Sequence, residues 1–192
     1  MPATSKKGSR GMDAIALLKK DHQTARQLLK RLESSAENGR GDSAAVLRQI
    51  ENELKVHTQI EEEIFYPVFR NAVKSQEDAK LYYEALEEHH VIDLVLFQIK
   101  STSKNSDEFP AKAKVLKDLV EHHAEKEEAK MFPKARKAMG AAGLRELGQR
   151  LQERKQELTG SFAGRIEKIL QPFIREARRQ RSAARTNKRR AA

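Results

Sequence analysis

Two stretches of this chain repeat one another: HTQIEEEIFYP at residues 57–67 and HAEKEEAKMFP at residues 123–133. In both stretches, the leading histidine precedes a glutamate by four residues and a proline by ten. Upstream, Asp21-His22 and Glu88-His89 form a second matching pair, and their histidines stand 35 and 34 residues before those of the two stretches. The chain therefore contains two copies of one unit, and each copy has the length of a helical hairpin.

The hydrophobic pattern around these copies is helical. Apolar residues recur at helical spacing in five segments, and the polar segments 38–42 and 101–110 interrupt the pattern. This spacing predicts helices over 13–37, 43–73, 77–100 and 111–139, with Gly140 as a C-cap, and a fifth helix from 144 to the residue before Pro172. The fold class is therefore all-α: an up-down-up-down four-helix bundle with an additional C-terminal helix outside it or at one end.

The composition excludes several classes of protein. The 192 residues include no cysteine, which rules out disulfides, iron–sulfur clusters, thiolate zinc sites and thiol catalysis. No apolar run approaches the length of a membrane span, and the N-terminal apolar stretch is too short for a secretion signal. We therefore expect a soluble, cytoplasmic protein without a transmembrane segment.

The formal net charge of +10 is concentrated at the two ends of the chain. Residues 1–11 carry three basic and no acidic side chains, and residues 165–192 carry ten basic and two acidic ones. We expect a disordered basic N-terminus over 1–11, the bundle over 12–160, and a C-terminal helix extension with a basic tail over 161–192. The tail either contacts nucleic acid or anionic lipid non-specifically or serves only as a solvated extension.

Acidic and histidine side chains fall on the apolar faces of the predicted helices. Positions i and i+4 share one face of a helix, so His57 points the same way as Glu61, and His123 the same way as Glu127. Unpartnered carboxylates inside a bundle cost several kcal/mol each. Cations among these side chains would remove that cost. The candidate metal ligands are His22, His57, Glu61, His89, His123 and Glu127.

The number and type of these candidates favour particular metals. Six ligands are too many for one tetrahedral zinc ion, and calcium or magnesium sites do not use four histidines. A mixture of imidazole and carboxylate in a bundle core suits a pair of iron or manganese ions. The repeat then predicts two histidines for each ion, with Glu61 and Glu127 as bridges and open positions for water, dioxygen, peroxide or nitric oxide.

These motifs resemble the hemerythrin family, in its HHE cation-binding branch. The resemblance covers about residues 12–160 and rests on LLKKDH at 17–22, EEH at 87–89, and the segments 57–67 and 122–134. It implies a four-helix bundle with an oxo- or hydroxo-bridged di-iron centre, held by the six candidate ligands. Two iron ions are the expected cofactor, with manganese or zinc ranked below iron.

The chain departs from the oxygen-carrying hemerythrins, which have five histidines and a His-x-x-x-His on the third helix. Here Asp93 stands four residues after His89. This departure favours the relatives associated with sensing, peroxide breakdown or iron handling over oxygen carriage. The absence of cysteine separates the chain from relatives that repair iron clusters.

Two histidines and four acidic residues adjoin the candidate ligands. We expect His90 and His122 at the surface rather than as spare ligands, because each lies about 100° round the helix from its neighbour. The acidic neighbours either orient the imidazoles or, as we favour, are solvated helix charges: Asp21, Glu62, Glu88 and Glu128.

Three aromatic residues near the candidates are assigned to packing. Tyr66 and Phe132 stand before the two prolines, where we expect them to pack at one end of the bundle. Tyr82 shares the stripe of His89 and is assigned to the core, although that stripe also leads toward the metals.

The leading functional hypothesis is a hemerythrin-like di-iron protein that binds dioxygen, nitric oxide or iron, in sensing or in the response to oxidative stress. The alternative from the enzyme class is a di-iron oxidoreductase that consumes peroxide or oxidises ferrous iron. Two further hypotheses are an architectural nucleic-acid protein that acts through its tail and a metal-free structural bundle.

Overall fold

The computed structural model describes residues 11–38 and 42–160. The chain divides into two units, Met1–Arg154 and Lys155–Ala192. The first unit contains the bundle, and of the second only residues 155–160 are described, as helix. The predicted N-terminal segment 1–11, apart from Gly11, and the predicted extension and tail 161–192 lie outside the described residues.

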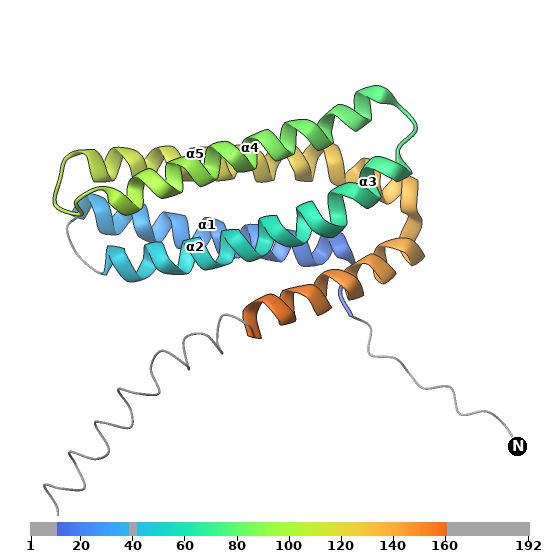
Figure 1. Ribbon diagram of the computed structural model, residues 1–192, viewed down its shortest axis with the longest axis horizontal. Helices are drawn as coiled ribbons and strands as arrows, with labels where there is room; N and C mark the ends of the chain where they lie inside the picture. Colours follow the sequence, from blue (N-terminus) through green and yellow to red (C-terminus); the bar gives the residue numbers. More distant parts are fainter. Residues whose placement is uncertain (1–10, 39–41, 161–192) are drawn as a thin grey trace, which may run out of the picture. The chain divides into compact units, whose positions relative to one another are not determined.

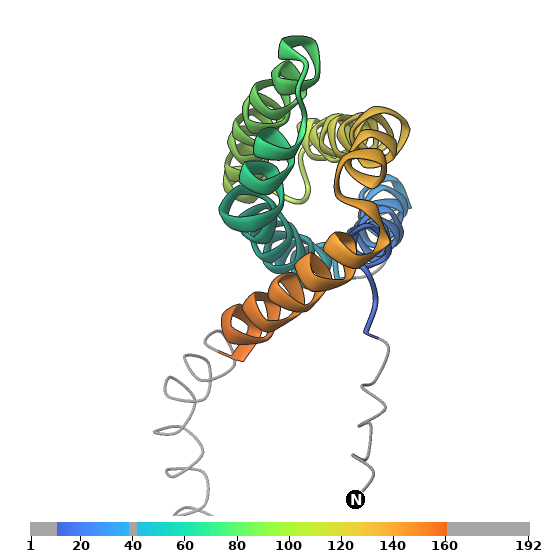
Figure 2. The same cartoon turned by 90° about the vertical axis from the view of Figure 1, so that its right-hand side faces the viewer.

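Four long helices build the first unit. They are α1 (Ala14–Asn38), α2 (Ser43–Ile60), α4 (Gln76–Ser101) and α5 (Glu108–Lys126). Figure 1 shows them side by side with alternating chain direction, and Figure 2 shows them arranged around a common axis. Helix α1 contacts both α2 and α5, and α4 contacts α2 and α5, so the ring is closed. The predicted up-down-up-down four-helix bundle is confirmed.

Side-chain caps explain where three of these helices begin. The Asp42 carboxylate accepts a hydrogen bond from the Ala45 amide at the start of α2, and Ser75 accepts from the amides of Glu77 and Asp78 at the start of α4. The Asp13 carboxylate accepts from the Ala16 amide at the start of α1. These contacts satisfy amide groups that a first helical turn leaves without carbonyl partners.

The start of the fourth predicted helix is corrected by three residues. The pattern predicts helix from 111, but α5 begins at Glu108 and includes Phe109 and Pro110. A proline is tolerated in the first turn because its missing N–H has no partner there. Phe109 is fully buried, so packing extends the helix into a segment whose polar composition suggested a loop.

The second and fourth predicted helices are not regular α-helices throughout. A wide π-helical turn, η1 (Glu61–Phe65), separates α2 from α3 (Tyr66–Ala72), and a matching turn, η2 (Glu127–Met131), follows α5. The Tyr66 amide donates to the carbonyl of Glu61, and the Phe132 amide donates to that of Glu127, each across five residues. Each wide turn is followed at its second residue by a proline of the repeat, Pro67 or Pro133.

The core has two apolar layers with the candidate residues between them. One layer is mainly aliphatic and includes Leu29, Leu54, Leu96 and Leu116. The other is aromatic: Phe65 stacks on Phe69 and meets Phe132 edge-on, with ring centroids 6.4 and 5.6 Å apart. The polar side chains of the repeat lie along the helices between these layers and are themselves buried.

Beyond η2 every residue from 132 to 154 is helical, so no loop separates the predicted fourth helix from the predicted fifth. Gly140 has a φ of 65°, in the left-handed region that favours glycine and that the sequence predicts for a C-cap, although the helical residues continue past it. The helical segment after it packs Leu144, Leu147 and Leu151 into the core. Among the described residues, none of the helices combines the length and the apolar character that crossing a membrane requires.

Candidate metal centre

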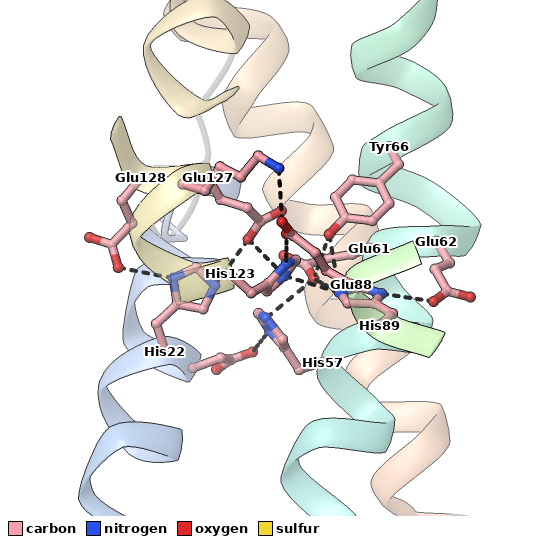
Figure 3. Close-up of polar contacts among 12 residues, drawn as sticks. His22, His57, Glu61, Glu62, Tyr66, Glu88, His89, His123, Glu127 and Glu128 are labelled. Atoms are coloured by element: carbon pink, nitrogen blue, oxygen red, sulfur yellow. Dashed lines mark hydrogen bonds and ion pairs between the residues drawn. The ribbon is translucent and has the colours of Figure 1, made fainter. Parts of the chain in front are cut away.

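The structure brings all six predicted ligands together in the core. His22 lies on α1, His57 on α2, His89 on α4 and His123 on α5, while the two glutamates begin the wide turns η1 and η2. Figure 3 shows their side chains converging from all four helices. Each is at most 5% exposed: His22, His57, Glu61, His89, His123 and Glu127.

The four imidazoles form two pairs that match the two copies of the repeat. The ring centroids of His22 and His57 lie 4.9 Å apart, and those of His89 and His123 lie 4.6 Å apart. Each pair therefore comes from one helical hairpin, as the repeat predicts.

Each buried carboxylate touches one imidazole of each pair. Oε2 of Glu61 lies 3.2 Å from Nε2 of His57 and 3.5 Å from Nε2 of His89. Oε2 of Glu127 lies 3.1 Å from Nε2 of His22 and 3.6 Å from Nε2 of His123. Both glutamates therefore stand between the two imidazole pairs, where a bridging carboxylate would have to lie.

The donor atoms fall into two groups that could each hold a cation. His22, His57, Glu61 and Glu127 each offer an atom within 4.8 Å of the others, and so do Glu61, His89 and His123. Apart from the ion pairs above, several of these atoms make no hydrogen bond of acceptable geometry among the described residues: Nε2 of His22 and of His57, Oε1 of Glu61, and both oxygens of Glu127. Buried polar atoms are normally paired. Metal ions would satisfy these ones, so the residues fit a metal centre.

Without metal, burial and neighbouring charges shift the pKa values of Glu61, Glu127 and His57. Burial, followed by repulsion from Glu127, raises the pKa of Glu61 well above its ordinary value. Burial also opposes ionisation of Glu127, but the nearby imidazoles of His123 and His22 lower its pKa below the ordinary value. Burial lowers the pKa of His57 to about 4, so this imidazole is neutral at pH 7, as a metal ligand must be.

Acidic residues bind the outer nitrogens of three imidazoles. Nδ1 of His22 lies 3.0 Å from Glu128, Nδ1 of His89 lies 2.8 Å from Glu62, and Nδ1 of His123 lies 2.9 Å from Glu88. A carboxylate accepts, so each Nδ1 donates to its acid, and Nε2 is the nitrogen that would face a metal ion. Nδ1 of His57 lies 3.7 Å from Asp21, which is the corresponding acid of the first hairpin.

This pairing corrects our preference for solvated helix charges. Glu88 and Glu128 are 23% exposed and Glu62 is 40% exposed, so these carboxylates lie at the edge of the core. Two of these carboxylates also pair with basic side chains. Arg26 lies 2.9 Å from Glu128, and Lys126 lies 2.8 Å from Glu88. The helix periodicity could not decide this, because each acid contacts a histidine on a different helix.

Tyr66 belongs to the site, which corrects the sequence assignment to end packing. Its hydroxyl donates to Oε2 of Glu61 at 3.3 Å and lies 3.2 Å from Nε2 of His89. An α-helix turns about 100° per residue and would place Tyr66 about 140° from Glu61. The wide turn η1 instead brings the Tyr66 side chain round to the same side as Glu61, so that the two are in contact. One indication of this role was available in the sequence, since Tyr66 and Phe132 occupy equivalent positions in the two copies of the repeat.

The remaining neighbours behave largely as predicted. His90 is 69% exposed and His122 is also exposed, whereas His89 and His123 are buried in the core. Phe132 packs as expected, with its ring stacked on that of His22 at 5.8 Å. Tyr82 meets Tyr66 edge-on at 6.3 Å, so it is in contact with the edge of the site.

Comparison with known proteins agrees with this architecture. The family model of the hemerythrin HHE cation-binding domain matches residues 13–135. The chain therefore belongs to the hemerythrin HHE cation-binding family. A hemerythrin HHE cation-binding domain-containing protein from Mycobacterium kansasii has a similar crystal structure, with a TM-score of 0.68 and 25% identity. The likeness covers 78% of this chain and 89% of that one.

A relative from Nostoc sp. named DNA nickase is 28% identical over 121 residues. The match covers 63% of this chain but only 33% of that relative, so the chain spans about a third of its length.

Proposed function

We propose that this protein is a non-haem di-iron protein that binds dioxygen, nitric oxide or iron itself, in sensing or in the response to oxidative stress. Residues 12–160 form the functional domain in this proposal. His22 and His57 would hold one ion and His89 and His123 the other, with Glu61 and Glu127 between them. Manganese or zinc would be weaker alternatives, since imidazole mixed with carboxylate in a bundle core suits a pair of iron ions.

One observation carries the proposal. Nε2 of His89 and Nε2 of His123 face each other 3.1 Å apart, although each ring directs its Nδ1 at a carboxylate. Two lone pairs at this distance repel unless a proton or a cation lies between the rings. The other buried atoms without a hydrogen-bond donor also need a positive charge nearby, and bound cations would satisfy all of them.

The chain's own side chains would prepare the site for such ions. Glu62, Glu88 and Glu128 keep the proton on the outer nitrogen of their imidazoles, which leaves the inner nitrogen free to bind. The aromatic layer excludes water from one side. Bound iron would supply reversible ligand binding and a change of oxidation state.

Metal analysis of matched histidine variants tests the proposal. We expect about two irons per chain in protein purified without a histidine tag, as in other di-iron bundles. His89→Ala should lose at least half of this iron, whereas His90→Ala should keep it, because the two histidines are neighbours in the chain but only one is buried. Equal iron in both variants, or no iron in the wild type after anaerobic ferrous loading, would refute the proposal.

A peroxide-consuming di-iron enzyme is the second candidate. It is supported by the Tyr66 hydroxyl, a buried proton donor that contacts both Glu61 and His89. A pure binder would release no oxygen from peroxide, whereas an enzyme would release it over many turnovers. If Tyr66 serves this reaction, Tyr66→Phe should slow oxygen release while the iron content stays that of the wild type.

A contact with DNA is a separate proposal for the basic end of the chain. Its support is the DNA nickase among the relatives and the ten basic residues within 165–192. The contact would be electrostatic and would weaken as salt rises. Deleting residues 175–192 should abolish retention of the protein on DNA at low salt. Retention on vesicles of anionic lipid alone would assign the tail to membranes instead.

A further inference from the structure

A small cavity lies beside the centre, between α4 and the turn η2. Its volume is about 10 Å³, close to the minimum that holds one water molecule. Its walls are Leu81, Ala85, Glu88, Lys126, Glu127 and Met131. One end is therefore at the site itself, since Glu127 is one of the six candidate ligands.

The cavity runs from the surface layer to the buried site. At its inner end, Ala85, Glu127 and Met131 are 2–3% exposed. At its outer end, Lys126 and Glu88 are 20% and 23% exposed, and Leu81 is also half-buried. Three of its walls are apolar, so a molecule inside it meets hydrogen-bond acceptors only at Glu127 and Glu88.

Lys126 lies at the outer end, held between two carboxylates. Nζ of Lys126 lies 2.7 Å from Glu84 and 2.8 Å from Glu88, both on α4, while Lys126 itself is the last residue of α5. One cation between two carboxylates leaves the opening with a net negative charge.

We propose that this cavity is the route by which small uncharged molecules, such as nitric oxide, dioxygen or hydrogen peroxide, reach the metal centre, with Lys126 as its gate and Ala85 as part of its inner wall. The inference rests on the proposed di-iron function and adds which ligands the site admits. An anion meets a negative opening and apolar walls, both of which oppose its entry. A neutral diatomic molecule meets neither penalty.

Filling the cavity is the first test, with nitric oxide as the probe. Ala85→Leu adds three carbons at the inner wall, so association of nitric oxide with the ferrous protein should slow by at least tenfold in stopped-flow measurements. Ala113→Leu is the matched control, because Ala113 is fully buried in the aliphatic layer away from the cavity. If Ala85→Leu disturbs folding, the smaller Ala85→Val should slow association to a lesser degree.

Opening the gate is the second test. Lys126→Ala should speed the association of nitric oxide several-fold, whereas Lys114→Ala, which removes an exposed lysine paired with Asp118 on the same helix, should not change it. Glu84→Gln neutralises one carboxylate of the opening. It should speed the binding of azide, an anion, to the ferric protein and leave the rate for nitric oxide unchanged.

Iron content and thermal unfolding are measured for every variant, which separates this inference from the proposed function. A wild type that holds iron, with Ala85 and Lys126 variants that bind nitric oxide at the wild-type rate, would overturn the route and leave the di-iron function standing. A wild type without iron would overturn both.

Discussion

Each of the buried imidazoles is held from two sides. Its outer nitrogen faces an acid from a neighbouring helix, and its inner nitrogen faces Glu61 or Glu127. The arrangement follows the repeat, because the residue after each buried glutamate accepts a hydrogen bond from a histidine of the other hairpin. Glu62 accepts from His89, and Glu128 accepts from His22. Removing an outer acid should therefore weaken metal binding without removing a ligand.

Glu128→Gln tests this at the residue scale. An amide in place of the carboxylate makes the His22 imidazole a weaker ligand, so we expect metal affinity to fall by about 10- to 100-fold. Glu87→Gln is the control, since Glu87 is 78% exposed and contacts only the surface histidine His90 among the described residues. Competition with a chelator of known affinity measures both. Equal affinities would show that Glu128 is only a surface charge.

At the residue scale, the sequence predicted some contacts of the site but not others. The i and i+4 spacing placed His57 with Glu61 and His123 with Glu127, because a helix face is a local property of the chain. It did not place Tyr66 in the site or pair Glu88 with His123. These contacts depend on the wide turn η1 and on how neighbouring helices are rotated.

The elements of the bundle are positioned by a few close contacts. The segment after Gly140 approaches the start of α1 so closely that a Cβ on Gly148 would overlap the Met12 carbonyl and lie 2.8 Å from the Ala14 nitrogen. No side chain fits there, because the atoms in the way belong to the backbone. Leu144, Leu147 and Leu151 are buried by this approach.

Gly148→Ala should therefore lower the free energy of unfolding by about 1–3 kcal/mol, the usual cost of overpacking a core. Gly143→Ala is the matched control in the same segment, where the added Cβ meets only Met139 at an ordinary 3.4 Å. It should stabilise the protein by up to about 1 kcal/mol through helix propensity. Urea denaturation of both variants checks this, and a neutral Gly148→Ala would contradict the close packing.

An ion-pair cluster joins α2 to α4 at the surface. Glu51 accepts hydrogen bonds from Lys55 on its own helix and from Lys100 on α4. Burial opposes its ionisation, but these two lysines hold the pKa of Glu51 below its ordinary value. The stabilisation is present above the ordinary pKa of a glutamate, near 4.5, and is lost as the pH falls through the lower pKa of the folded state.

Glu51→Gln should therefore cost about 0.5–1 kcal/mol at pH 7, typical of a partly exposed pair, and progressively less as the pH falls below 4.5. Thermal unfolding of both proteins at a series of pH values measures the difference. A cost that stays constant down to pH 3 would mean that the charge of Glu51 does not contribute.

At the scale of the whole molecule, the centre sits where the four helices meet and ties both hairpins together. Without metal, the protein buries two carboxylates and four imidazoles with several atoms unpaired among the described residues. Ligands that bind only the folded state stabilise it by mass action. Metal binding should therefore stabilise the bundle as a unit.

Removing the metal with a chelator should lower the unfolding free energy by about 4 kcal/mol if the free metal had been at about a thousand times its dissociation constant. For a chain of this size, that corresponds to a fall in melting temperature of roughly 10 °C. Scanning calorimetry with and without chelator measures it. His89→Ala should show little dependence on metal, and a wild type that melts identically in both conditions would favour a metal-free structural bundle.

The sequence by itself determined the helical fold class, the two-hairpin repeat and the six converging side chains, because each of these depends on spacing along single helices. Only the tertiary structure decided which acid orients which imidazole, that Tyr66 enters the site, and that a cavity with Lys126 at its outer end leads to Glu127. Those features arise from the rotation of one helix against another and from wide turns that depart from the 3.6-residue period. Local periodicity does not contain that information, since it emerges only when four helices pack around one core.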